Sequence, residues 1–222
     1  MPQHIVRGYG GHGAAPQATN DPIVIASEIV VALQTIVSRE MDPQLPTVVT
    51  VGSFHAGTKH NIIPDEAHLQ LTVRTMNPAQ REKVLDSISR VANGIASAAG
   101  VPAERMPIVT VAEDHVSATI NDPALTRRVA AGLEHTLGKE NVVQVEAAMA
   151  SEDFSLYALD EPKPPICMFS LGAADPVKFQ EARDKGTRLP GPHSAEFAPV
   201  PEPTIRTGVK AMTGAVLEIL KK

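Results

Sequence analysis

Four polar side chains stand in local settings that favour chemistry. His12 lies in the glycine-rich run Gly8–Gly13, where the lack of side chains lets an imidazole and the backbone approach a ligand closely. Asn61 lies in a loop, Arg74 follows it on a predicted strand, and His193 lies in a proline-flanked turn. An amide and a guanidinium suit a carboxylate or a polarised carbonyl. For His12, an exposed loop histidine with no such role is the alternative.

The run Gly57–Thr75 turns from a loop into a strand. Leu69, Leu71 and Val73 alternate with polar residues, which is the period-two pattern of a strand with one buried face. This pattern places Arg74 on the opposite, open face. The spacing leaves two interpretations, a guanidinium that binds a carboxylate and a solvated arginine on an open sheet.

A metal site would need several converging ligands. His193 is held by the Pro-Gly-Pro turn before it, and Glu152 and Asp153 could be ligands or support them. The sequence contains no H-E-x-x-H or C-x-x-C motif, and no G-x-S-x-G run that would present a serine nucleophile. Spacing therefore offers a metal site as one interpretation only.

The elements that must position these residues have a recognisable order. Asp21-Pro22 and Asn77-Pro78 each predict a helix start, with a capping side chain followed by proline in the first turn. The full order over residues 3–112 is strand, helix, strand, strand, helix, strand. This is the split βαβ order of a ferredoxin-like domain.

The second half predicts an incomplete α/β sheet. Asp122-Pro123 starts a helix, and a last helix spans Thr204–Leu220 with its larger apolar residues expected on the inner face. The remaining predictions are strands at Val142–Val145 and Pro165–Leu171 and a charged, mobile loop at Asp175–Arg188.

Composition excludes several classes of partner. The net charge is −5 with no basic cluster, and aromatic residues make up 3%, which argues against nucleic-acid binding. The single cysteine, Cys167, is predicted to be a buried strand thiol. We expect no membrane span, because no apolar stretch approaches the roughly 18 residues needed. No signal peptide is recognisable at the start, so the expected location is cytoplasmic.

The runs GGHGAAPQ…NDP, GTKHNIIPDE…LTVRT, MASEDFS and PHSAEF occur in this order. Together they resemble the aminoacylase/carboxypeptidase family of dinuclear metallopeptidases, closest to its hippurate hydrolase and N-acyl-amino-acid amidohydrolase branch. The resemblance covers nearly the whole chain. It implies that residues 1–113 form a ferredoxin-like lid, or dimerisation, domain and that residues 114–222 form the C-terminal portion of an α/β metal-dependent catalytic domain.

The resemblance also implies residue roles. His12 matches a catalytic lid histidine that reaches across a dimer to the scissile carbonyl. Asn61 and Arg74 match the residues that hold the substrate carboxylate. His193 matches the last metal ligand, and the expected cofactor is a divalent zinc or manganese ion. The implied substrate is a small N-acyl amino acid.

The departures from the family pattern concern the metal. The family's other ligands and its general base, a glutamate, precede the lid, and they are not found in this chain. Gln17 also replaces a histidine that is frequent in this branch. One imidazole binds zinc too weakly to hold a catalytic ion. We therefore expect a portion of a metal-dependent amidohydrolase that is inactive alone, and the alternative is a non-catalytic dimerisation or carboxylate-binding module.

The first predicted helix indicates a partner. Its apolar surface, over about Asp21–Arg39, is wider than one buried stripe because Val24 and Val31 extend it. With the family's paired lids in view, we expect a homodimer that forms through this helix and an edge strand.

Overall fold

The computed structural model of the chain describes residues 2–112, 116–146, 148–149, 152–159 and 161–221. The chain divides into two compact units, Met1–Ala118 with Ala148–Asp153, and Thr119–Ala147 with Phe154–Lys222. The first unit contains the segment predicted to be the lid and also takes in a short later segment, 148–153.

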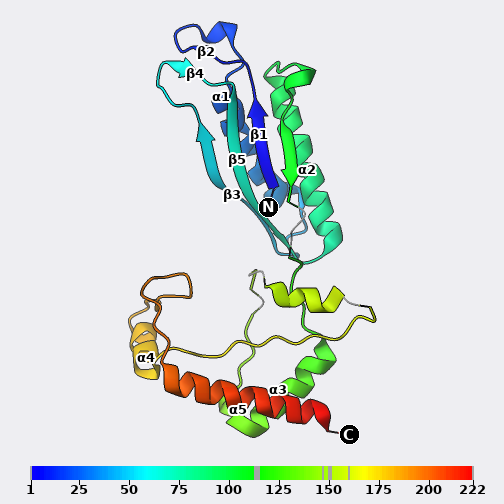
Figure 1. Ribbon diagram of the computed structural model, residues 1–222, viewed down its shortest axis with the longest axis vertical. Coiled ribbons are helices and arrows are strands. Elements are labelled where there is room, and N and C mark those ends of the chain that lie inside the picture. The colour runs from blue at the N-terminus through cyan, green and yellow to red at the C-terminus, as the bar shows by residue number, and fades with distance from the viewer. Residues whose placement is uncertain (1, 113–115, 147, 150–151, 160, 222) are drawn as a thin grey trace. The chain divides into compact units, whose positions relative to one another are not determined.

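The first unit is built on a four-stranded sheet in the order β3-β5-β1-β6 (Figure 1). Every neighbouring pair in this sheet is antiparallel. Two helices connect the strands in the βαββαβ order, so the predicted ferredoxin-like topology is confirmed. The strands are β1 (Pro2–Arg7), β3 (Thr47–Ala56), β5 (Glu66–Thr75) and β6 (Ile108–Val111).

Helices α1 (Pro22–Thr35) and α2 (Pro78–Ala98) pack against the sheet, and both begin where the sequence predicted. The Asp21 carboxylate accepts the Ile23 amide at 2.9 Å, and the Asn77 side chain accepts the Gln80 amide at 2.8 Å. Each cap satisfies a backbone donor that the first helical turn leaves unpaired. A π-helical turn, η2 (Ile36–Glu40), continues α1, and a short 3-10 turn, η3 (Ala103–Arg105), follows α2.

The core of this unit lies between the helices and one face of β5. Leu69 and Leu71 are buried, as their alternation predicted, whereas Val73 of the same predicted face is half-buried. Ala67 is buried as well, and Arg74 has the opposite parity. Burial of each such leucine stabilises the fold by about 1.5–3 kcal/mol relative to exposure. The helices contribute the fully buried Ile29, Leu33, Val84 and Ile88, and η2 contributes the fully buried Ile36.

The expectation about long apolar stretches was wrong for Pro22–Glu40. This segment has 19 residues and a mean hydropathy of 1.5, so it passes a test for a membrane span by length and composition alone. Ile25, Ile29 and Leu33 on one face of it belong to the core between helices and sheet. A core helix passes the same test because its inner face must match the apolar side of the sheet.

A two-stranded ribbon leads into the start of β5. It pairs β2 (Gly11–His12) with β4 (Ile62–Ile63) in antiparallel register, so that His12 lies opposite Ile62. A 3-10 turn, η1 (Pro16–Ala18), follows β2. The sequence predicted only loops here, because two-residue strands leave no readable alternation.

The second unit centres on two helices, α3 (Pro123–Leu137) and α5 (Pro201–Leu220). Asp122 caps α3 by accepting the Leu125 amide at 2.7 Å, as its position before proline predicted. Shorter helices are η4 (Lys139–Asn141), η5 (Asp153–Leu159) and α4 (Pro176–Asp184). The buried cluster between α3 and α5 is small and comprises Val129, Leu133, Ala211 and Ala215.

Two predictions of strands were wrong. Val142–Val145 and Pro165–Leu171 form no strand, and the described residues of this unit include no strand with which they could pair. An apolar segment becomes a strand only when a neighbour completes its hydrogen bonds. Val143 is 75% exposed, and Cys167 is half-buried rather than fully buried.

Two predictions about helices were also wrong. The segment predicted as a mobile loop contains α4, which Asp175 caps by accepting the Val177 amide at 2.9 Å. In α5 the larger residues do not face inward: Val209 is 62% and Met212 57% exposed. Small residues such as Ala211 face α3 instead, because close approach of two helix backbones leaves no room for longer side chains.

Candidate functional site

His12 lies on β2 and Asn61 lies directly before β4, so both residues belong to the same end of the β2–β4 ribbon. The Gly13 amide donates to the Asn61 carbonyl at 2.9 Å, directly after His12. A Cβ atom on Gly13 would come within 3.2 Å of the Asn61 backbone, so the strands approach closely because this residue is glycine. Both side chains are exposed, which leaves the imidazole and the amide accessible to a ligand.

The hydrogen bonding of His12 fixes which proton it can offer. Its Nδ1 atom accepts the Ala14 amide at 3.1 Å. An imidazole nitrogen that accepts carries no proton, so in the neutral ring the proton is on Nε2. His12 can therefore donate from Nε2 to a carbonyl oxygen or an oxyanion.

Arg74 lies on the open face of β5, paired in register with Val48 of β3. Its Nη1 donates to the Met149 carbonyl at 2.7 Å. Met149 belongs to the segment 148–153 that clusters with the first unit. Arg74 is therefore not a fully solvated side chain, because the residue is half-buried and donates to a later segment of the chain.

The structure does not bring the predicted residues into one place on this chain. Asn61 precedes β4, and β4 leads through Pro64 and Asp65 into the start of β5. Arg74 lies one residue before the other end of β5. Eight steps along a strand from Glu66 to Arg74 correspond to roughly 26 Å at about 3.3 Å per residue. His12 and Asn61 thus form one group, and Arg74 a second.

His193 lies in the second unit, exposed in a tight turn. The Ser194 amide donates to the Gly191 carbonyl at 2.9 Å, which closes the turn around it. Glu152 and Asp153 are exposed. Within the described ranges, no three histidine, cysteine, aspartate or glutamate side chains gather where they could hold a metal ion. The residues described here do not by themselves fit a dinuclear centre.

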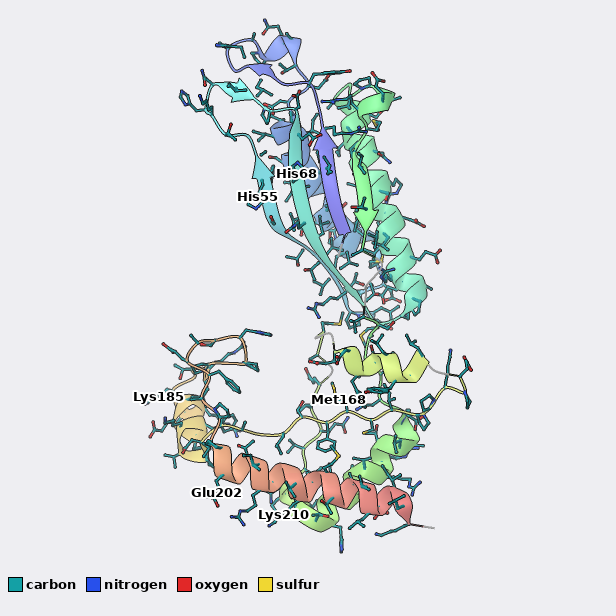
Figure 2. All side chains as sticks on the ribbon, in the orientation of Figure 1. His55, His68, Met168, Lys185, Glu202 and Lys210 are labelled. Carbon is teal, nitrogen blue, oxygen red and sulfur yellow. The ribbon has the colours of Figure 1, made fainter. Side chains whose placement is uncertain are left out.

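A further polar group on the open face of the lid sheet is not among the residues predicted from the sequence. His55 of β3 lies directly opposite His68 of β5, and Figure 2 labels both on neighbouring strands. The His68 Nε2 atom is 3.3 Å from the Glu66 carboxylate. Strand parity would have placed all three on one face, but the bulge after Val51 resets the register of β3 and hides this from the sequence.

The sequence profile of a peptidase dimerisation domain, M20_dimer, matches residues 4–99, from β1 to the end of α2. A thermostable carboxypeptidase 2 from Saccharolobus solfataricus is 35% identical over 215 residues, which are 97% of this chain and 49% of that protein. This chain belongs to the M20 peptidase family.

Other M20 relatives extend the similarity. An N-acetyldiaminopimelate deacetylase from Enterococcus faecalis is 36% identical over 214 residues, 94% of this chain and 50% of that protein. The crystal structure of a putative aminohydrolase from methicillin-resistant Staphylococcus aureus has a TM-score of 0.74 at 30% identity, covering 99% of this chain and 52% of that one. The chain thus spans about half the length of the relatives it matches.

Proposed function

We propose that the chain is the lid and an adjoining portion of a metal-dependent amidohydrolase that cleaves N-acyl amino acids or hippurate-type amides. The observation that carries this proposal is the match to M20 relatives over nearly the whole chain, one of which is named as a deacetylase of an N-acetylated amino acid. The exposed His12, Asn61 and the strand-mounted Arg74 are the groups we assign to the substrate.

Arg74 is our candidate for the substrate carboxylate. A guanidinium on a strand has a fixed direction, and its planar group of N–H donors matches the two oxygens of a carboxylate, which accept. The contact with the Met149 carbonyl uses Nη1 and holds the group in place. His12, with its proton on Nε2, is our candidate donor to the scissile carbonyl as negative charge develops on its oxygen.

The separation of the two groups supports a substrate site shared between two copies of the lid. With roughly 26 Å of strand between them, Arg74 cannot act on the same small substrate as His12 and Asn61 of its own chain. In a homodimer, Arg74 of one copy would act with His12 and Asn61 of the other. This changes the expectation that Asn61 and Arg74 of a single chain hold one carboxylate.

One side of the first unit suits such pairing. β3 is an edge strand of ten residues with an open hydrogen-bonding edge. The helix α1 packs against β3 and exposes Val24 at 53% and Val31 at 71%. We propose that this side forms the dimer. Light scattering should show a dimer of the chain at micromolar concentration and a monomer for Val31→Lys, and a wild-type monomer would exclude the shared site.

A bound divalent metal ion would supply an activated water as the nucleophile. Because the described residues do not complete a metal site, we assign this chain the contacts to the substrate and no step at the metal. We expect His193 to be one ligand in the complete enzyme. The alternative of a non-catalytic, carboxylate-binding module keeps the lid contacts and lacks turnover.

The test compares an N-acyl amino acid with its carboxamide analogue in the complete, metal-loaded gene product. Arg74→Ala removes a charge-assisted contact of about 1.5–3 kcal/mol, which is roughly a 10- to 150-fold fall in kcat/KM for the acid. The carboxamide should be affected far less, and Arg74→Lys should restore only part because a point charge lacks the fork. His12→Ala should slow both substrates by lowering kcat.

Two outcomes would overturn the assignment. If Arg74→Ala slows the acid and the carboxamide equally, Arg74 does not bind the carboxylate. If the complete gene product shows no turnover with metal bound yet still binds N-acyl amino acids more tightly than their carboxamides, the non-catalytic module is correct. Gln70→Ala, an exposed change on the same strand and face, is the matched control and should leave both substrates unaffected.

A further inference from the structure

The turn that carries His12 is built from glycines and is closely enclosed by neighbouring backbone. A Cβ atom on Gly8 would lie 2.0 Å from the Asn20 carbonyl oxygen, and one on Gly10 would lie 2.4 Å from the Ile63 carbonyl oxygen. Only glycine permits these approaches. Glycines also leave a chain with more freedom than any other residue, so an ordered turn of this composition needs contacts that hold it.

Arg105, at the end of η3, supplies several of these contacts from 97 positions away in the sequence. Its Nε donates to the Gly8 carbonyl at 3.0 Å, and its Nη2 donates to the same oxygen. Its guanidinium carbon lies 5.0 Å from the centre of the Tyr9 ring, in a cation–π arrangement. One side chain thus holds both the carbonyl and the ring at the entrance of the turn.

Asp65, just before β5, contacts the turn from the other side. We call Arg105 and Asp65, together with their contacts to the turn, the clamp. Its carboxylate accepts the Gly10 amide at 3.0 Å and lies 3.7 Å from the Arg105 guanidinium. Its backbone carbonyl accepts the Gly8 amide at 2.9 Å. Asp65 also follows Asn61 by four residues, so the same residue links the glycine turn to the β4 segment that carries the amide.

We propose that Arg105 and Asp65 are positioning residues that fix the Gly8–Gly13 turn and thereby aim His12 and Asn61. This inference rests on the proposed role of these two side chains in substrate binding. A preorganised donor needs no ordering when the substrate arrives, whereas a donor on a free glycine loop would have to be ordered at each turnover.

The clamp is separate from the forces that fold the lid. Neither Arg105 nor Asp65 belongs to the buried core, and their side chains are 26% and 74% exposed, respectively. The pairing of β1 with β5 ends at Arg7, one residue before the turn begins. Loss of the clamp should therefore loosen the turn and leave the sheet intact.

The first experiment measures amide hydrogen exchange by NMR in the chain itself. In Arg105→Ala, the Gly10, Gly13 and Ala14 amides should exchange at least about 10-fold faster, while the amides of β1 and β5 stay protected. Arg105→Lys should restore part of the protection. Arg90→Ala is the matched control. Arg90 lies on α2, its guanidinium is 2.6 Å from the Glu40 carboxylate of η2, and it does not contact the turn.

Two results would overturn the clamp. The first is unchanged exchange in the turn of Arg105→Ala, and the second is faster exchange throughout the sheet, which would show a general structural role. Should Arg105→Ala fail to fold, Asp65→Asn and Tyr9→Leu each remove one part of the clamp and face the same two criteria. This measurement needs no turnover, so its outcome is independent of the proposed function.

The second experiment asks whether the clamp acts through His12. In the complete, metal-loaded gene product, Arg105→Ala should lower kcat for an acid and its carboxamide alike, and it should have little further effect in a His12→Ala background. Full additivity of the two substitutions would overturn the link to His12. If Arg74→Ala meanwhile slows both substrates equally, the carboxylate assignment fails while the clamp stands.

Discussion

The two units of the chain use the same local signals and reach different degrees of burial. In the lid, α1 and α2 each start at a proline that follows a capping side chain. Both helices bury a wide apolar face against the four-stranded sheet. In the second unit, α3 and α5 also start at prolines, yet the core between them consists of Val129, Leu133, Ala211 and Ala215. Helices form from local signals in both units, but a large core forms only where a sheet is present to receive them.

The exposed residues of the second unit show the same contrast. Val209 and Val216 of α5 are 62% and 45% exposed, on a helix whose other face packs closely on α3. Soluble proteins rarely leave such a stripe bare. Since the chain spans about half the length of its relatives, we propose that this face is covered in a protein of their full length.

The largest expected difference between the units comes from matched leucine truncations. Leu69→Ala in the lid removes a side chain that is 1% exposed and should lower the free energy of unfolding by about 2–5 kcal/mol. Leu217→Ala in α5, where the leucine is 60% exposed, should change it by no more than about 0.5 kcal/mol. Urea unfolding followed by circular dichroism measures both, and equal losses would contradict the comparison.

Glycine-to-alanine changes in two helices should change the free energy of unfolding in opposite directions. Gly94 in α2 has no atom within 4 Å of an added Cβ, so Gly94→Ala should stabilise by about 0.5–1 kcal/mol. At Gly132 in α3 an added Cβ would lie 2.8 Å from the Glu218 Cβ and 3.0 Å from the Gly214 carbonyl. Overpacking of about 1–3 kcal/mol should outweigh the gain in helix propensity. Thermal unfolding measures both variants. If Gly132→Ala proves more stable than wild type, α3 and α5 can move apart at little cost.

The smallest expected difference concerns two carboxyl groups and pH. The Arg90 hydrogen bond, helped by Ser87, lowers the pKa of Glu40 below its ordinary value of 4.5, and Lys221 lowers the pKa of Glu218. A pKa lowered in the folded state gives stability that is present above about pH 4.5 and is lost as pH falls through the folded pKa.

Glu40→Gln should therefore destabilise the lid at pH 7, and the difference from wild type should shrink as the pH is lowered below 4.5. Glu218→Gln should have a weaker effect at every pH, because its main partner, Lys221, is three residues away at the same helix end. Urea unfolding at a series of pH values tests this, and a pH-independent Glu40→Gln effect would exclude the linkage.

The sequence by itself determined the helix starts, the alternation of β5 and the order of elements in the lid. Asp21, Asn77 and Asp122 each precede proline and cap a helix, because capping depends on groups within a few residues. The alternation of Leu69 and Leu71 likewise fixed the parity of Arg74. The motif runs indicated the family, and the similarity to M20 relatives confirmed it.

Only the tertiary structure decided what meets across long distances. It joined Gly13, which follows His12, to the Asn61 carbonyl and left Arg74 near the far end of β5. It also joined Arg105 to the Gly8 carbonyl. Among the described residues it also left 142–145 and 165–171 without strand partners, although both segments have apolar residues suited to strands. Strand pairing and contacts of this kind depend on which distant backbone lies alongside, and local sequence periodicity carries no information about that neighbour.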